Sequence, residues 1–139
     1  MFWDTSALIR CYAPLEPGHA RARNFLLAEK GHRASAFIVP EVVSAVVRKL
    51  GRDRRNREAL LRTIEEHLEY FDLVTIDDEH LKVTSQLIRA HFLRAADALH
   101  LASAIILARG LGKRRMPFLT ADAEQADAAR AEKLNVFEI

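Results

Sequence analysis

Four acidic side chains are the residues of this sequence best suited to chemistry. Asp4, Glu41 and Asp122 each follow a short apolar run that resembles a β-strand, and Asp97 opens the helical segment DALHLASAIILA. Carboxylates held close together repel one another when ionised and raise one another's pKa. A divalent cation relieves that repulsion. Oxygen ligands without a His or Cys cluster select a hard ion, Mg²⁺ or Mn²⁺, over zinc.

A hard ion of this kind keeps several waters and is completed by phosphate oxygens of a substrate, so the implied chemistry is phosphoryl transfer or phosphodiester hydrolysis. Two basic clusters offer partners for phosphate. The segment RKLGRDRRNR at 48–57 contains Arg52, Arg54 and Arg55, and the second cluster is Lys113, Arg114 and Arg115. Each cluster is equally explained as a solvated surface, and the net charge of +2 is too small to identify a nucleic-acid binder.

Each acid also has a purely structural explanation. Asp4 and Asp122 are suited to N-caps, and Gln125 stands three residues after Asp122, the spacing of a capping box. Glu41 directly follows a proline, which is typical of a helix start, and Asp97 is a first-turn acid. Position favours a shared site, because the strands before Asp4, Glu41 and Asp122 are expected to be neighbours, about 4.8 Å apart.

The elements that would position these acids follow from the apolar pattern. Apolar residues at helical spacing predict helices over 7–12, 20–27, 42–50, 60–71, 81–92 and 99–107. Short β-like runs predict strands over 2–3, 34–39, 73–76, 117–120 and 136–139. Strands alternating with helices indicate an α/β fold, a parallel sheet covered on both faces. Right-handed crossovers and a sheet that begins in its middle favour the strand order 3-2-1-4-5.

One long segment needs a break that no residue marks clearly. From Asp78 to Arg109 the chain has neither Gly nor Pro. A single helix of that length is unusual in a small domain, so we expect two helices that meet near Arg94-Ala95-Ala96.

The totals fit one ordinary domain over 1–139, with half of the residues hydrophobic and 29% charged. No apolar run reaches the roughly 18 residues of a membrane-spanning helix, and the N-terminus has no signal-like pattern, so we expect a cytoplasmic protein without a membrane partner. The lone Cys11 is interpreted as a small buried hydrophobe.

Four segments spread over the whole chain form a recognisable set: DTSAL at 4–8, IVPEVVSAVVRKL at 38–50, DALHLASA at 97–104 and LTADAEQADAA at 119–129. In these segments the chain resembles PIN-domain ribonucleases, and among them the VapC-type toxins of bacterial toxin–antitoxin pairs. DTSAL and DALHLA are each moderately specific, and all four segments in this order are strongly specific.

The resemblance implies a three-layer α/β/α sandwich whose acidic pocket binds Mg²⁺ or Mn²⁺ and cleaves single-stranded or loop RNA, leaving 3′-hydroxyl and 5′-phosphate ends. The residues that match catalytic carboxylates are Asp4, Glu41, Asp97 and Asp122. We expect Asp4, Asp97 and Asp122 to hold the metal, and Glu41 to orient the attacking water. The residues that match supporting hydroxyl positions are Thr5, Ser6 and Thr120. A cognate antitoxin and a homodimer are also implied.

Three neighbouring positions have open interpretations. His100 follows Asp97 by three residues, which would allow a metal pair, although a His packed beside the site on a carboxylate or backbone group is the commoner outcome. Arg94 is placed to contact RNA phosphate or a pocket acid, and is equally explained as a surface residue. Asp77 and Asp78 also follow a strand, but an edge strand, so we expect them to cap a helix.

Two rival functions remain. A non-catalytic RNA- or partner-binding module would keep the fold without the chemistry, and it would bind RNA equally well with EDTA and with Mg²⁺. A phosphomonoesterase would use Asp4 as a covalent nucleophile, but enzymes that resemble haloacid dehalogenases carry a second Asp two residues later, where this chain has Ser6.

Overall fold

The central strand of the sheet, β1 (Phe2–Trp3), has two residues and a parallel neighbour on each side. These neighbours are β2 (Arg33–Ser35) and β4 (Pro117–Thr120), and β3 (Asp72–Val74) and β5 (Asn135–Glu138) form the edges. The order is therefore 3-2-1-4-5 with every pairing parallel, which confirms the predicted topology. The structure, a computed structural model, describes residues 1–28, 30–112 and 116–139.

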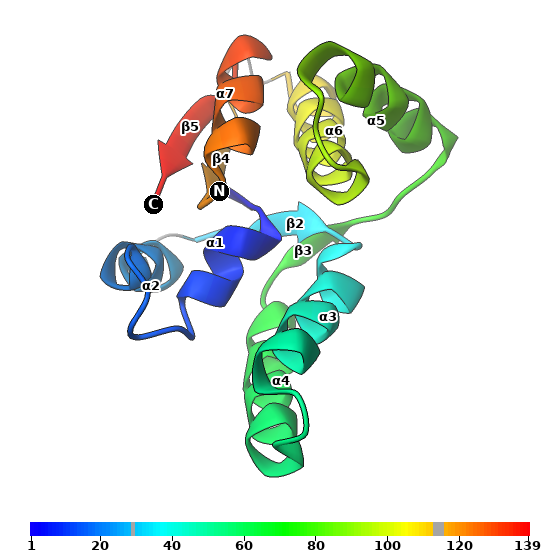
Figure 1. Ribbon diagram of the computed structural model, residues 1–139. Helices are drawn as coiled ribbons and strands as arrows, with labels where there is room; N and C mark the ends of the chain where they lie inside the picture. Colours follow the sequence, from blue (N-terminus) through cyan, green and yellow to red (C-terminus); the bar gives the residue numbers. More distant parts are fainter. Residues whose placement is uncertain (29, 113–115) are drawn as a thin grey trace.

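Helices cover both faces of this sheet, so the fold is the expected three-layer α/β/α sandwich (Figure 1). On one face lie α1 (Thr5–Arg10), α2 (His19–Ala28), α3 (Ile38–Leu50) and α4 (Arg54–Leu68). On the other lie α5 (Asp78–His91), α6 (Ala95–Gly110) and α7 (Ala123–Ala131).

The two faces of β1 carry two separate apolar cores. Trp3 packs with Leu119 and the helices α1 to α4, whereas Phe2 packs with Phe118 beneath α5 to α7, and the two Phe rings stack with centroids 5.9 Å apart. Successive strand residues point to opposite faces, so a two-residue strand serves both cores. Each fully buried ring contributes roughly 1.5–3 kcal/mol of stability. Burial on both sides fixes the position of Asp4, which follows Trp3.

The second strand is shorter than predicted. The pattern indicated 34–39, but β2 ends at Ser35, whose hydroxyl accepts a hydrogen bond from the Phe37 N–H at 3.2 Å and turns the chain. The next helix, α3, therefore begins at Ile38, and Pro40 is its third residue rather than its first. Proline is tolerated there because the N–H groups of the first turn have no partner inside the helix.

The helix α7 was not predicted from apolar spacing. Its buried face is made of small residues, Ala126, Ala128 and Ala129, together with Gln125. Alanines give little contrast between an apolar and a polar face, so the 3.6-residue period is weak in this segment.

The long segment after β3 does divide into two helices, as expected, slightly before the predicted position. The helix α5 ends at His91, Phe92 adopts a left-handed conformation with φ 58°, and the extended residue Arg94 precedes α6. None of the described helices alone is long and apolar enough to cross a membrane; α5 and α6, bent by 117° at this break, reach that length and composition only as a pair.

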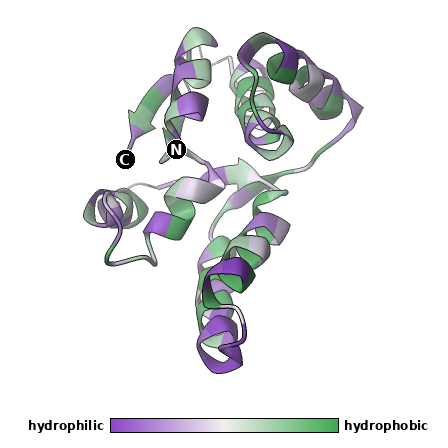
Figure 2. Ribbon diagram, viewed as in Figure 1, coloured by the Kyte–Doolittle hydropathy of each residue, from purple (hydrophilic) through white to green (hydrophobic). Residues whose placement is uncertain are grey.

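Hydropathy follows the layers (Figure 2). Hydrophobic residues run through α6, which is buried on most of its surface, whereas hydrophilic residues gather at the end of the α3–α4 pair that lies farthest from the sheet. On one side of β1, α6 is therefore a largely buried helix. On the other side, the α3–α4 pair ends in an exposed, charged region far from the sheet.

Candidate active site

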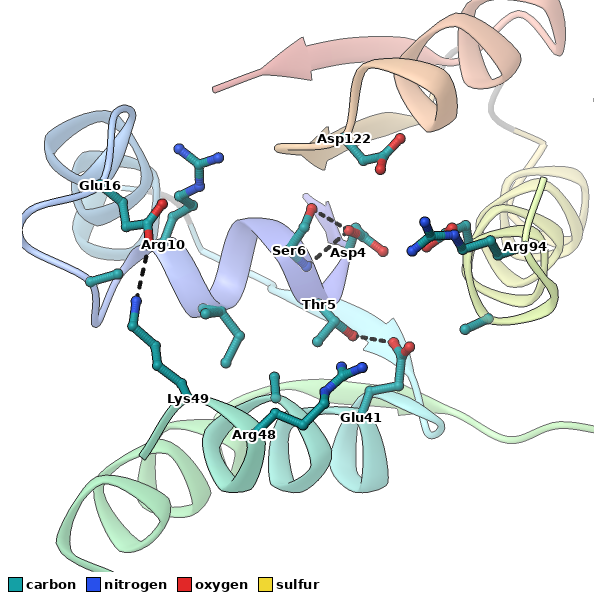
Figure 3. A pocket seen from close by; sticks show the side chains of 15 residues that line it. Asp4, Thr5, Ser6, Arg10, Glu16, Glu41, Arg48, Lys49, Arg94 and Asp122 are labelled. Carbon is teal, nitrogen blue, oxygen red and sulfur yellow. Dashed lines mark hydrogen bonds and ion pairs between the residues drawn. The ribbon is translucent and has the colours of Figure 1, made fainter. Parts of the chain in front are cut away.

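A cleft of about 480 Å³ opens beyond the carboxyl ends of the central strands. Such a position, where the chain leaves neighbouring strands in opposite directions, is the usual ligand site of an open α/β sheet. All four acids singled out from the sequence line it: Asp4, Glu41, Asp97 and Asp122. They come from four places in the fold, namely the end of β1, the first turns of α3 and α6, and the start of α7 (Figure 3).

Asp4 is held almost completely buried, with 2% of its surface exposed. It caps α1, and its Oδ2 accepts hydrogen bonds from the N–H and the hydroxyl of Ser6. Its Oδ1 accepts one bond, at 3.0 Å, from the side-chain amide of Gln125. A carboxylate oxygen has two lone pairs, so Oδ1 keeps one for a further contact. The N-cap and the functional interpretation of Asp4 are therefore compatible.

Two of the predicted hydroxyls join the ends of β1 and β4. The Ser6 hydroxyl lies 3.2 Å from the Thr120 hydroxyl and accepts a hydrogen bond from the Ala121 N–H at 2.9 Å. The Thr120 hydroxyl in turn accepts from the Asp122 N–H at 3.0 Å and lies 3.4 Å from Asp4 Oδ2. This network fixes Asp4 relative to Asp122.

The third hydroxyl, Thr5, belongs to a different network around Glu41. The Thr5 hydroxyl donates to Glu41 Oε2 at 2.6 Å, and Nε2 of the fully buried His100 lies 2.6 Å from the same oxygen. Burial alone raises the pKa of Glu41, but the hydrogen bonds from His100 and Thr5 outweigh it and lower the pKa below its usual value. Glu41 is therefore ionised at neutral pH, and its Oε1 has no hydrogen-bond partner among the described residues.

His100 acts as a support for Glu41 in this structure. Burial lowers the pKa of the ring, but the hydrogen bond to Glu41 and the nearby carboxylates more than offset that effect, so the pKa is raised. Its Nδ1 is buried without a hydrogen-bond partner among the described atoms. Because Nε2 is engaged by Glu41 and Nδ1 is enclosed, His100 does not supply a metal ligand beside Asp97.

The pKa of Asp97 reflects both its burial and the carboxylates around it. Burial raises its pKa, the charges of Asp4, Asp122 and Glu41 raise it further, and the result is a pKa of about 6. Its carboxylate makes no hydrogen bond with the described residues, although its backbone carbonyl accepts one from Gln125 at 3.0 Å. Asp97 therefore carries negative charge that the protein itself does not neutralise.

Gln125 is a site residue that sequence reasoning missed. Asp122 caps α7 and accepts the Gln125 N–H at 2.8 Å, as the capping-box spacing predicted. The Gln125 side chain does not complete that box. It is fully buried and instead donates to Asp4 and to the Asp97 carbonyl, while it accepts from the Thr120 hydroxyl at 2.6 Å. The capping-box spacing already accounted for a Gln at this position, so nothing in the sequence indicated a second role for it.

The donor set fits a hard divalent ion held partly through water. The available groups are carboxylate and hydroxyl oxygens, which suit Mg²⁺ or Mn²⁺. Over the described ranges, no three acidic, His or Cys side chains come close enough together to hold an ion directly. Mg²⁺ typically binds through one or two carboxylates and keeps several waters, so this spacing suits it better than an ion that needs a complete protein cage.

Basic side chains form the walls of the cleft. Arg10, Arg48 and Lys49 lie on the side of α1 and α3, and Arg94 lies at the opposite side, beside α6 (Figure 3). Arg94 thus occupies the predicted place. Arg48 and Lys49 could have been assigned to the cleft from the sequence, because they follow Glu41 by seven and eight residues and share its helix face.

The other predicted basic residues are not at the cleft. Arg52, Arg54 and Arg55 are exposed at the turn from α3 into α4 and do not line it. Lys113, Arg114 and Arg115 lie outside the described residues. Asp77, in contrast, is confirmed as a helix cap: it accepts the His80 N–H at 3.1 Å at the start of α5, next to the edge strand.

Comparison with known proteins identifies one family. A model of the PIN domain matches residues 1–131. Among curated proteins, none matches the chain.

Three solved structures share the fold. A toxin–antitoxin complex from Klebsiella pneumoniae has 21% identity and a TM-score of 0.61, covering 99% of this chain and 98% of that one. PAE2754 from Pyrobaculum aerophilum has 18% identity and a TM-score of 0.65, with 99% and 87% covered. VapBC2 from Rickettsia felis, bound to a DNA fragment from its promoter, has 10% identity and a TM-score of 0.65, with 99% and 96% covered. At these identities the likeness is one of fold.

Proposed function

The chain belongs to the PIN domain family, and from that premise we propose that it is a Mg²⁺- or Mn²⁺-dependent endoribonuclease, the toxin of a toxin–antitoxin pair. The observation that carries the proposal is the charge arrangement of the cleft. Four carboxylates from four elements line one cleft, where burial and the charges of its neighbours raise the pKa of Asp97 to about 6, and Arg10, Arg48 and Arg94 line the same cleft. Such a centre suits a cation, and such walls suit a phosphate chain.

Asp4 and Asp97 would hold the ion, and Asp122 would complete its shell through water. When bound, it supplies positive charge for the phosphate oxygens and makes water a better nucleophile. The networks around Asp4 and Asp122 leave these side chains little freedom, so the site is organised before substrate arrives. Arg94 and Arg48 bind the phosphates on either side of the scissile bond.

Glu41 is assigned to the attacking water. Its lowered pKa keeps it ionised, and the contacts from Thr5 and His100 hold Oε2, while Oε1 has no partner among the described residues and is available to a water in the cleft that Glu41 lines. The water oxygen attacks phosphorus, its proton passes to Glu41, the bond to the 3′ oxygen breaks, and that oxygen takes a proton from solvent. The products carry 3′-hydroxyl and 5′-phosphate ends.

The toxin role, an antitoxin partner, a homodimer and a cytoplasmic location belong to the same proposal, as does the assignment of residues 1–139 to one nuclease domain. Two of the similar structures are a toxin–antitoxin complex and VapBC2, which supports an antitoxin as the partner.

The test is RNA cleavage by purified protein. Wild type, Asp4→Asn and Asp77→Asn are incubated with total RNA in Mg²⁺, Mn²⁺ or EDTA, and the ends of the products are mapped. Cleavage that requires metal and Asp4, and that Asp77→Asn retains, supports the proposal; Asp77 is the matched control because it is an acidic helix cap away from the cleft.

Two outcomes would contradict it. RNA binding of equal strength in EDTA and Mg²⁺, with no cleavage in any condition, indicates a non-catalytic binding module. A trapped phosphoaspartate at Asp4 indicates a phosphomonoesterase.

A further inference from the structure

Phe92 combines two features that are unfavourable for a folded protein. Its backbone is left-handed, with φ 58° and ψ 25°, at the position that ends α5. Glycine is the usual residue there, and a bulky side chain in this conformation is an outlier. The residue is 89% exposed, so its side chain gains almost nothing from burial. Backbone strain that brings no packing is a sign that a side chain is kept for a contact outside the chain.

The position of Phe92 is fixed by its neighbours. The Phe92 N–H donates to the Ile88 carbonyl at 2.9 Å, and Leu93, which is 5% exposed, packs in the core under α5 and α6. Arg94 follows directly and lines the cleft. Because two residues span at most about 7 Å, the backbone of Phe92 lies close to that of Arg94, on the side of the cleft that Arg94 lines.

The charges of the cleft give a substrate a path that leads past this ring. Cationic side chains on α1 and α3 form one wall, the carboxylates lie in the middle, and Arg94 forms the opposite wall (Figure 3). A phosphate chain that crosses the carboxylates therefore leaves beside Arg94. Phe92, two residues before Arg94 in the chain, is an exposed aromatic side chain close to this exit.

We propose that Phe92 stacks on an unpaired base of the RNA, one or two nucleotides from the scissile phosphate; this inference rests on the proposed ribonuclease function. Aromatic rings recognise splayed bases in single-stranded RNA, and they do so with little regard to sequence, since every base has a π-face. Phe92 would thus make the enzyme prefer unpaired RNA without choosing its sequence. A paired base cannot present its face to the ring.

The experiment measures binding without cleavage. In an Asp4→Asn background, affinity and fluorescence are measured with single-stranded RNA that carries 2-aminopurine, and with the same strand in a duplex. We expect Phe92 to quench the fluorescence of the single strand. Phe92→Ala and Phe92→Leu should lose that quenching and about tenfold in affinity, whereas Phe92→Tyr should keep both.

Two controls separate a binding role from a structural one. Tyr70 is 80% exposed and lies two residues before β3, at the amino end of that strand and not among the residues that line the cleft, so Tyr70→Ala should bind RNA like the parent protein. Phe92→Gly should melt at a higher temperature, because glycine relieves the left-handed strain, and yet bind single-stranded RNA as weakly as Phe92→Ala.

The inference is overturned if Phe92→Ala binds and quenches single-stranded RNA as its parent does, or if both proteins fail to bind it. A protein partner would then be the better occupant for the ring. This result is distinct from a failure of the proposed function, which is read from cleavage by the protein with Asp4 intact. Normal cleavage together with Phe92-independent binding would refute the stacking contact alone.

Discussion

At the scale of single residues, the acids of the cleft favour function over stability. Asp97 has a pKa of about 6, against a value of 3.8 without the protein environment. A carboxyl whose pKa is raised on folding supports the folded state below pH 4 and loses that support as the pH rises through 6. Above pH 6 the metal-free protein therefore carries a destabilising charge at this position.

Asp97→Asn should accordingly stabilise the metal-free protein at pH 8. Because the side chain is only partly buried, solvent screens part of the effect of the raised pKa on stability. We therefore expect a gain of about 1–2 kcal/mol in the free energy of unfolding. The check is thermal melting in EDTA at pH 8 and pH 4, and the gain should disappear at pH 4. Adding Mn²⁺ at pH 8 should raise the melting temperature of the wild type more than that of Asp97→Asn. A variant no more stable than wild type at pH 8 would show that burial and the neighbouring carboxylates do not destabilise ionised Asp97.

Gln125 supports the opposite balance, because its removal should cost both stability and activity. Gln125→Leu keeps a similar volume but removes one hydrogen bond each from Asp4, Thr120 and the Asp97 carbonyl. We expect a loss of about 2–3 kcal/mol in the free energy of unfolding, measured by urea denaturation, together with impaired cleavage. Gln86→Leu, at an exposed position of α5, is the matched control and should change stability by less than about 0.5 kcal/mol.

At the scale of elements, α3 brings acid and base to one face of the cleft. Glu41 lies in its first turn and Arg48 two turns later, both facing the cleft. Arg52, Arg54 and Arg55 lie beyond its end, so the basic segment from Arg48 to Arg57 divides into a part at the cleft and a part away from it.

Arg48→Gln should therefore weaken binding of short RNA oligomers and reduce the salt slope by about one, in line with one lost phosphate contact. Neutralising Arg52, Arg54 and Arg55 together should weaken binding of long RNA only, because a short oligomer in the cleft does not reach them. Titration of both variants with short and long RNA at several salt concentrations checks this division. Equal effects on short RNA would place the far cluster on the substrate path.

Most of the fold and the positions of the four acids could be predicted, because strand order follows from crossover rules and the carboxyl ends of parallel strands share an edge. What local patterns could not give are contacts between distant residues. Gln125 already fitted a cap, and His100 shows its link to Glu41 only once α3 and α6 are packed. The residue at which β2 ends and the residue at which α3 begins depend on one hydrogen bond, which the Ser35 hydroxyl accepts from the Phe37 N–H.

At the scale of the whole molecule, β1 ties the sheet together through long-range pairs. Phe2 pairs with Arg33 and with Phe118, and the Asp4 N–H donates to the Leu119 carbonyl at 2.9 Å. These bonds lie in the middle of two cores, so local fraying cannot open them.

The Asp4 amide should consequently exchange with solvent only through global unfolding. Hydrogen exchange measured by NMR should give it an opening free energy equal to the stability obtained from denaturation, whereas amides at the exposed end of α4 should open at far lower free energy. An Asp4 amide that exchanges much faster than global unfolding allows would mean that the site opens locally.

The two-residue strand also sets the order of events during synthesis. The pairing partners of Trp3 and Asp4 on β4, and the amide of Gln125 that orients Asp4, are made more than a hundred residues after them. A nascent chain still growing on the ribosome lacks the second side of β1 until the last quarter of the protein has emerged, because non-local pairs cannot form before both partners exist. The acidic centre is therefore assembled only when translation is nearly finished, so a truncated chain that ends before β4 cannot form it.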